Sequence, residues 1–301
     1  MLKSLLVTLN RLVFRACLIS CGFFMFTNTA KAIDLLPFDY VPAPAGTNAI
    51  LGFNFNNSAD SFKDTSSNRI FESEFKSHVG AVKIARYEDL GGLPVAAALA
   101  IPYGRIYDTK IGDVSLNEPE GFGDPIFSFF FWPINQPEKG RWLGIGNFLT
   151  IPMGEYNKGQ ALNIGENRWK HDLQIGLVQS LPGNFTLDLT VDWINYGSNK
   201  SAGTGSQKLT QKYTFEGYAW LSYNISPTSW LSVGYQATFG GKQKIDGIFN
   251  GTETKSQQVR VSYGQFITPT TKLVGMYGRD VSRTGGFELD HSFQLQITHL
   301  F

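Results

Sequence analysis

The sequence predicts an all-β fold, a closed antiparallel up-and-down transmembrane β-barrel of about twelve strands. Apolar and polar residues alternate over stretches of about 10 to 15 residues, whereas strands of soluble proteins average about 5–6 residues. The chain begins with an export leader. It ends with the aromatic residue Phe301 at the close of its last alternating stretch. A soluble β-sandwich would also use such strands, but these three observations together favour the barrel.

Residues 1–32 form the predicted signal peptide. A basic leader precedes an uncharged apolar stretch over residues 16–29, and an A-x-A site occupies residues 30–32. The apolar stretch is shorter than the roughly 20 residues that a membrane-spanning helix needs. We therefore expect cleavage after Ala32 and favour it over lipoprotein processing at Cys21 or an uncleaved membrane anchor.

Composition excludes several kinds of site. Cleavage after Ala32 would remove both cysteines, Cys17 and Cys21, and with them any disulfide, thiolate-bound metal or cysteine nucleophile. The net charge of +1 gives no basic field for nucleic acid. The remaining histidines lack zinc-ligand spacing, and there is no G-x-S-x-G motif. We therefore expect no enzyme activity, no catalytic residues, no cofactor and no metal.

The segment that follows the leader, residues 33–46, contains Pro37, Pro42 and Pro44. Proline lacks the backbone donor that a β-ladder needs, so this segment is not expected to be a strand. Two placements are open: the segment lies in the periplasm, or it folds into the lumen as a small plug.

The barrel is predicted over residues 47–301. Between residues 185 and 193, for example, the odd positions are Phe, Leu, Leu, Val and Trp, and the even positions are Thr or Asp. Each strand therefore has one lipid-facing side and one polar side. The twelve predicted strands are 47–57, 69–86, 94–105, 121–132, 141–152, 167–181, 184–196, 210–224, 228–241, 254–267, 270–282 and 287–301.

The connections between these strands alternate in length. Those after even-numbered strands are tight turns, apart from residues 134–140, and those after odd-numbered strands are long and rich in Gly, Ser and Asn. Short periplasmic turns and long extracellular loops are typical of outer-membrane barrels. The pattern puts both chain ends on the periplasmic side. Five tryptophans near predicted strand ends are expected in the aromatic girdles at the membrane surfaces: Trp132, Trp142, Trp169, Trp193 and Trp230.

Alternation also predicts which side chains line the lumen. The charged candidates are Lys170, Asp172, Asp188, Asp192, Glu216 and Arg260, and two aromatic candidates are Tyr218 and Trp220. Side chains alone can fill the interior of an eight-stranded barrel, but a barrel of twelve strands is wider. Its lumen could therefore hold water or a small ligand. Two interpretations remain open: a solute path with a charged constriction, or a salt-bridge network that closes and stiffens the barrel. The two aromatic side chains are expected to fill space rather than to bind a ligand.

Several short motifs, in this order along the chain, go beyond a generic barrel. They are Gly46-Thr47-Asn48, Asp89–Pro94, Ile101–Gly104, Gly121–Asp124, Ile151–Tyr156 and Asn163–Trp169. Together they resemble the family of outer-membrane barrel transporters named after the meta-pathway of phenol degradation. The resemblance covers nearly the whole chain after the leader and supplies no catalytic residues. Within its motifs, Asp124 is expected to cap a turn or bond across the lumen, and Arg168 to pair with an inward carboxylate; both are lumen candidates.

The resemblance implies an outer-membrane barrel that transports or channels small hydrophobic or aromatic compounds. The alternatives are a surface-exposed structural or interaction barrel without a transport role and, more remotely, a lipid-modifying barrel enzyme. Expected partners are outer-membrane lipid, the barrel assembly machinery, for which Phe301 would be the signal, and a small hydrophobic or aromatic solute. Nucleic acid is not expected. The predicted location is the outer membrane of a Gram-negative bacterium, reached through the cleaved signal peptide. Substrate, gating and oligomeric state are left open.

Overall fold

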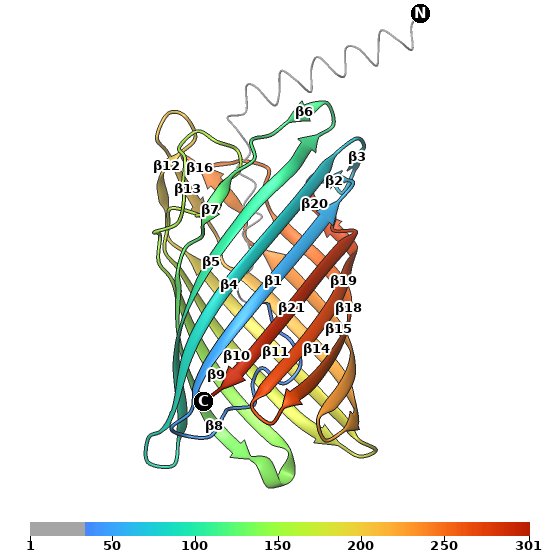
Figure 1. Cartoon of the computed structure of the whole chain (residues 1–301). Helices are drawn as coiled ribbons and strands as arrows, with labels where there is room; N and C mark the ends of the chain where they lie inside the picture. Colours follow the sequence, from blue (N-terminus) through green and yellow to red (C-terminus); the bar gives the residue numbers. More distant parts are fainter. Residues whose placement is uncertain (1–33) are drawn as a thin grey trace, which may run out of the picture.

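The computed structural model describes residues 34–301, so the predicted signal peptide lies outside the described residues. Twelve long strands form one closed antiparallel barrel (Figure 1), which confirms the predicted fold class. They are β1 (Asn48–Ala59), β4 (Glu74–Asp89), β5 (Pro94–Ile111), β8 (Ile126–Gln136), β9 (Arg141–Thr150), β10 (Lys170–Leu181), β11 (Phe185–Tyr196), β14 (Thr214–Ser226), β15 (Ser229–Gly240), β18 (Thr254–Thr268), β19 (Thr271–Thr284) and β21 (His291–Leu300).

The barrel closes where its first long strand meets its last. Strands β1 and β21 pair antiparallel from Ala49 opposite Leu300 to Ser58 opposite His291. The pairing extends one step further, because the backbone N–H of Asn48 donates to the carbonyl of Phe301 and the reverse bond is also made, at 2.8 and 2.9 Å. With this seam closed, no long strand of the barrel has a free edge.

Alternation sorts the side chains as the sequence predicts. On β21, Phe293 and Leu295 are 51% and 49% exposed on the outer face, whereas Gln294 and Gln296 are almost completely buried inside. The same outward apolar and inward polar pattern runs along β11 and β15. The barrel thus has an apolar exterior and a polar wall around its lumen. Among the described residues, no helix is long and apolar enough to cross a membrane.

Several strand boundaries differ from prediction, and three of the differences have a clear local reason. The strand predicted over 69–86 begins at Glu74, because residues 71–72 form a turn in which Glu72 has a φ of 60°. The strand predicted over 121–132 is divided into β7 (Glu120–Phe122) and β8, since Pro125 cannot donate to the ladder. Residues 134–140 are not a long loop, because β8 continues to Gln136 and the short helix η1 (Pro137–Lys139) makes the turn. The exception to the tight-turn rule therefore disappears.

The long connections are folded at the end of the barrel opposite the C-terminus (Figure 1). One small sheet combines β12 (Asn199–Ala202), β13 (Gln207–Gln211), β16 (Gln243–Ile245) and β17 (Ile248–Phe249). Another combines β20 (Gly286–Phe287), β2 (Phe62–Lys63) and β3 (Arg69–Ile70). The short strands β6 (Val114–Ser115) and β7 pair with β5. We refer to this end as the loop side and to the opposite end as the turn side.

The tryptophan prediction is partly wrong. Trp169 and Trp193 are exposed as expected for girdle residues, at 51% and 43%. Trp132 and Trp230 are buried, and Trp142 packs with buried residues, all three on inward positions. These three side chains face the N-terminal segment, which lies inside the lumen, and not lipid.

Candidate functional site: the lumen and its N-terminal segment

The N-terminal segment, residues 34–45, lies inside the lumen and not outside the barrel. Figure 1 shows it within the barrel, toward the turn side. Its polypeptide turns over residues 37–40 and returns to β1, where Thr47 and Gly46 bond to the backbone near Tyr87 at 2.8–2.9 Å. The segment is irregular, as its three prolines require. The sequence left two placements open for this segment, the periplasm or a small plug in the lumen. The structure shows the plug.

One end of the segment is held by an ion pair in the middle of the lumen. The guanidinium of Arg260 on β18 donates to the carboxylate of Asp34 at 2.7 Å. The side-chain amide of Gln294 on β21 donates to the carbonyl of Asp34 at 3.4 Å. Both charged side chains are nearly inaccessible, so each depends on the other for compensation.

Further along, wall side chains satisfy the backbone of the segment. The N–H of Phe38 donates to the carboxylate of Asp188 at 2.9 Å. The indole N–H of Trp132 donates to the carbonyl of Tyr40 at 2.8 Å. The indole N–H of Trp220 donates to the carbonyl of Leu35 at 3.3 Å. Buried backbone groups need such partners where no ladder supplies them. Inward tryptophans therefore serve the segment, because indole offers both a donor and a large apolar surface.

Tyr40 docks onto a flat patch of the wall. Its hydroxyl donates to Gln174 at 2.7 Å, and its ring crosses Gly144 and Gly176, which are paired across β9 and β10. A Cβ atom at Gly176 would lie 2.2 Å from the ring, and one at Gly144 would lie 2.5 Å from it. Both positions therefore need glycine for the ring to approach the backbone.

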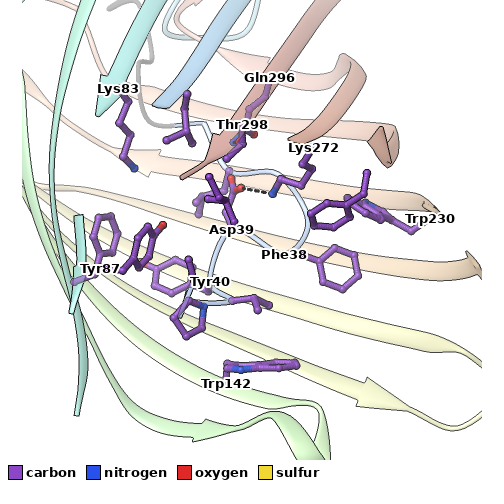
Figure 2. A pocket seen from close by; sticks show the side chains of 18 of the residues that line it. Phe38, Asp39, Tyr40, Lys83, Tyr87, Trp142, Trp230, Lys272, Gln296 and Thr298 are labelled. Carbon is purple, nitrogen blue, oxygen red and sulfur yellow. Dashed lines mark hydrogen bonds and ion pairs between the residues drawn. The ribbon is translucent and has the colours of Figure 1, made fainter. Parts of the chain in front are cut away.

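A cavity of about 760 Å³ lies beside the segment on the turn side. We call it the turn-side cavity. Apolar and aromatic side chains of the segment and of the barrel form much of its wall, beside polar side chains such as Gln174, Asn224 and Thr298. The aromatic members include Phe130. Five others are labelled in Figure 2: Phe38, Tyr40, Tyr87, Trp142 and Trp230.

Two lysines also line the turn-side cavity. Lys272 on β19 lies 3.8 Å from the carboxylate of Asp39, which is held in place by the N–H of Leu36. Lys83 on β4 has its ammonium group 5.0 Å from the centre of the Phe130 ring. Figure 2 shows both lysines reaching into the cavity from different strands. The cavity thus combines aromatic walls with positive charge.

A second cavity, of about 220 Å³, lies toward the loop side, and we call it the loop-side cavity. Asp34 and Ile126 line both cavities, so the two are neighbours divided by the end of the N-terminal segment. The loop-side cavity is strongly charged. Its lining includes Arg168, Lys170, Asp172, Glu216, Arg260, Asp280 and Arg283.

Glu216 and Arg260 are each held by more than one hydrogen bond. Glu216 accepts hydrogen bonds from the hydroxyls of Tyr218 and Thr238 at 2.7 and 2.8 Å. Arg260 donates to Gln258 at 2.6 Å and also to Gln236, besides its bond to Asp34. The two side chains are therefore fixed in orientation before any solute arrives.

At the loop side, Glu166 is buried between two cations. It accepts from Arg168 at 2.8 Å and pairs with Lys170. Burial alone would raise the pKa of Glu166, but the charges of Lys170 and Arg168 outweigh it and lower that pKa from its ordinary value to about 2. Arg168 also lies 4.7 Å from the ring centre of Tyr196. This cluster anchors the loop before β10 to the barrel rim.

Asp124 lies in the gap between β7 and β8, and it lines neither cavity. Its carboxylate accepts the N–H of Gly154 at 2.8 Å and the N–H of Glu166 at 2.7 Å. It therefore ties two points of the loop between β9 and β10 to the junction of β7 and β8, a position that agrees with the turn-capping alternative and not with a bond across the lumen. The reason is that β8 begins only at Ile126, so Asp124 is not a strand residue.

The other predicted lumen residues divide into two groups. Arg168, Lys170, Asp172, Glu216 and Arg260 are brought together around the loop-side cavity. The remaining four, Asp188, Asp192, Tyr218 and Trp220, are buried on inward positions. Of these, Asp188 and Trp220 bond to the N-terminal segment, and Tyr218 packs with it. Phe301 is 67% exposed at the seam.

Sequence reasoning missed the turn-side cavity. Its principal residues on the wall are Lys83, Phe130 and Lys272, and on the segment Phe38 and Tyr40. A signal for the lysines was present, because each sits among apolar residues at an inward-facing position of a predicted strand. The aromatic residues of the segment carried no periodic signal.

The chain is similar in sequence to one described family. The family model with the description "Putative MetA-pathway of phenol degradation" matches residues 59–294. No curated protein sequence matches the chain.

Solved structures resemble the fold at different levels. The COG4313 outer membrane channel from Pseudomonas putida F1 is 28% identical, with a TM-score of 0.84 over 89% of this chain and 100% of that one. The β domain of the Bordetella autotransporter BrkA is 8% identical, with a TM-score of 0.53 over 84% of this chain and 98% of that one. The translocator domain of NalP from Neisseria meningitidis is 11% identical, with a TM-score of 0.50 over 87% and 91%. The two autotransporter domains share the fold alone.

Proposed function

We propose that this chain, which belongs to the phenol-degradation family whose model matches residues 59–294, is an outer-membrane channel for small hydrophobic or aromatic compounds. The outer-membrane location follows from the closed barrel with its apolar exterior and from the similarity to an outer membrane channel.

The observation that carries the proposal is the turn-side cavity. Its volume of about 760 Å³ lies in the range of about 300–1,000 Å³ that is usual for small-molecule sites. Aromatic side chains from the wall and from the N-terminal segment form its sides. Such walls favour flat apolar solutes, because ring pairs add to the gain from burying apolar surface.

The two cavities give a route with two different filters. A solute from the loop side first meets the smaller, charged cavity, where bonded side chains leave little free space. It then passes the end of the N-terminal segment at Asp34, which borders both cavities. In the turn-side cavity it meets aromatic walls. The N-terminal segment thereby limits the size of the solute that can pass, and the aromatic walls favour solutes with an apolar or aromatic body.

Uptake by liposomes that contain the purified barrel tests the proposal. We expect phenol and other small aromatic compounds to enter these liposomes faster than they enter protein-free liposomes. We also expect them to enter faster than glucose does. The proposal fails if the barrel speeds the entry of neither aromatic nor aliphatic apolar solutes. Planar-bilayer recordings with and without the same solutes give an independent measurement.

The buried Asp34–Arg260 pair favours a second candidate, a structural barrel without a transport role, because it holds the N-terminal segment inside the lumen. Liposomes that show no protein-dependent entry of any solute would support it. We infer no catalytic role. His291 and Ser292, the adjacent pair that could resemble a base and its nucleophile, lie on opposite faces of β21.

We further propose that the chain reaches the membrane through a signal peptide cleaved after Ala32 and that Phe301 is presented to the assembly machinery. Intact-mass analysis of protein from outer membranes tests the cleavage, since the mature chain should begin at Ile33. A mass that retains residues 1–32, or that carries lipid on Cys21, would contradict it.

A further inference from the structure

We propose that the turn-side cavity holds a binding site for aromatic carboxylates, with Lys83 as the group that recognises the carboxylate. This inference rests on the proposed channel function and narrows its solute class. The charged side chains that line this cavity do not all have an oppositely charged partner.

Four charged side chains line the turn-side cavity, and three of them have partners. Asp34 pairs with Arg260 at 2.7 Å, and Asp39 faces Lys272 at 3.8 Å. Lys83 has no carboxylate within ion-pair distance among the residues that the structure describes, and the charge of Asp39 acts on it only from further away, so that one carboxylate serves both lysines. Its ammonium group instead lies 5.0 Å from the centre of the Phe130 ring. One positive charge in this cavity is therefore left for a ligand.

An ammonium group on a largely apolar wall is costly to desolvate when it lacks an anion. The neighbours of Lys83 make the position apolar, because the buried residues Leu51 and Ala100 lie opposite it on the two adjacent strands and Phe130 lies beneath the ammonium. A ring contact compensates only part of that cost. A carboxylate would supply the missing charge and accept its hydrogen bonds.

The rest of the cavity selects the body of the ligand. Figure 2 shows Lys83 entering from one side, with Tyr87, Tyr40 and Trp142 beneath it and Phe38 with Trp230 across the space. Aromatic rings on several sides favour a flat aromatic body, since offset and edge-to-face pairs form in more than one direction. A volume of about 760 Å³ leaves room for one ring system together with water.

Three probes separate the chemical requirements: benzoate carries both the ring and the charge, phenol carries the ring without a charge at pH 7, and hexanoate carries the charge without a ring. Binding to the mature barrel is measured by calorimetry and by quenching of tryptophan fluorescence, because Trp142 and Trp230 line the cavity. We expect benzoate to bind about tenfold or more tightly than either other probe.

Lys83→Met tests the recognising group, and Lys255→Met is the matched control because Lys255 is an exposed strand lysine. We expect Lys83→Met to weaken benzoate binding about tenfold or more while phenol binding stays within about twofold. Lys83→Arg should keep most of the benzoate affinity, and Lys255→Met should keep all of it. Added salt should weaken benzoate binding in the native barrel and leave phenol binding unchanged.

The inference is overturned if hexanoate or phenol binds as tightly as benzoate, or if Lys83→Met binds benzoate as the native barrel does. If Lys83→Met does not fold, the inference is still tested on the native barrel by the affinities of the three probes and by the effect of salt on benzoate binding. Phenol entry into liposomes separates the two proposals: entry without Lys83-dependent benzoate binding overturns this inference alone, and no entry of any probe overturns the channel.

Discussion

Arg260 on the barrel wall donates to the carboxylate of Asp34 on the N-terminal segment at 2.7 Å, and both side chains are nearly inaccessible to solvent. This bond joins the segment to the wall at the boundary between the two cavities. Because loss of one partner leaves the other charge buried and uncompensated, the pair determines how firmly this end of the segment is held.

Arg260→Gln is therefore expected to loosen the segment and raise the conductance of the barrel in planar bilayers. Breaking a buried ion pair costs about 3–5 kcal/mol, and the adjoining cavity should reduce that cost here. Arg279→Gln is the control, since Arg279 is 62% exposed and its ion pair with Asp290 is 3.4 Å long. Equal conductance in the two variants would show that the Asp34 contact does not hold the segment.

Gly176→Ala should displace Tyr40, because the new Cβ would lie 2.2 Å from the ring. Overpacking of this kind costs about 1–3 kcal/mol, which thermal unfolding should register as a lower midpoint. Gly275→Ala is the control, since its Cβ would meet no atom within 4 Å. The double variant Gly176→Ala with Tyr40→Ala should lose less than the two single effects combined. Additive losses would mean that the ring and the glycine are not in conflict.

The barrel could be predicted from the sequence because, within each strand, apolar and polar residues alternate and so identify an outer and an inner face. Residues 185–193 alternate between apolar and polar side chains, as a strand with one apolar face requires, and β11 occupies Phe185–Tyr196. Turn residues then supply the count. The strand ends were less predictable where a single residue decides, as at Pro125, which divides β7 from β8.

The lumen was predictable only in part. Alternation locates wall residues such as Glu216 and Arg260, because their facing depends on strand position alone. It cannot locate the N-terminal segment, whose prolines exclude a strand without saying where the chain goes. Trp132 and Trp230 were assigned to the membrane surface for the same reason, since their partners are on that segment.

Phe301→Ala is expected to reduce the amount of folded barrel in outer membranes several-fold. The ring is 67% exposed and is not needed for the seam, because the bonds between residues 301 and 48 use backbone atoms. A large effect of its removal would therefore come from assembly. Phe293→Ala is the control, as an exposed phenylalanine on the same face of β21. Equal losses in both variants would indicate a general need for outer apolar surface and not a terminal signal.

The Glu166 cluster should make stability depend on acid pH. Since the charges of Lys170 and Arg168 lower the pKa of Glu166 to about 2, against an ordinary value of 4.5, the folded state favours the carboxylate. Its contribution is then complete above about pH 4.5 and is lost as the pH falls from there through 2. Glu166→Gln should lower the thermal unfolding midpoint at pH 7, and the difference from the native barrel should shrink below pH 4.5. Glu138→Gln, at an exposed turn position, should show no such difference at either pH. A gap between native and Glu166→Gln that stays constant down to pH 2 would mean that the ion pairs do not anchor this loop.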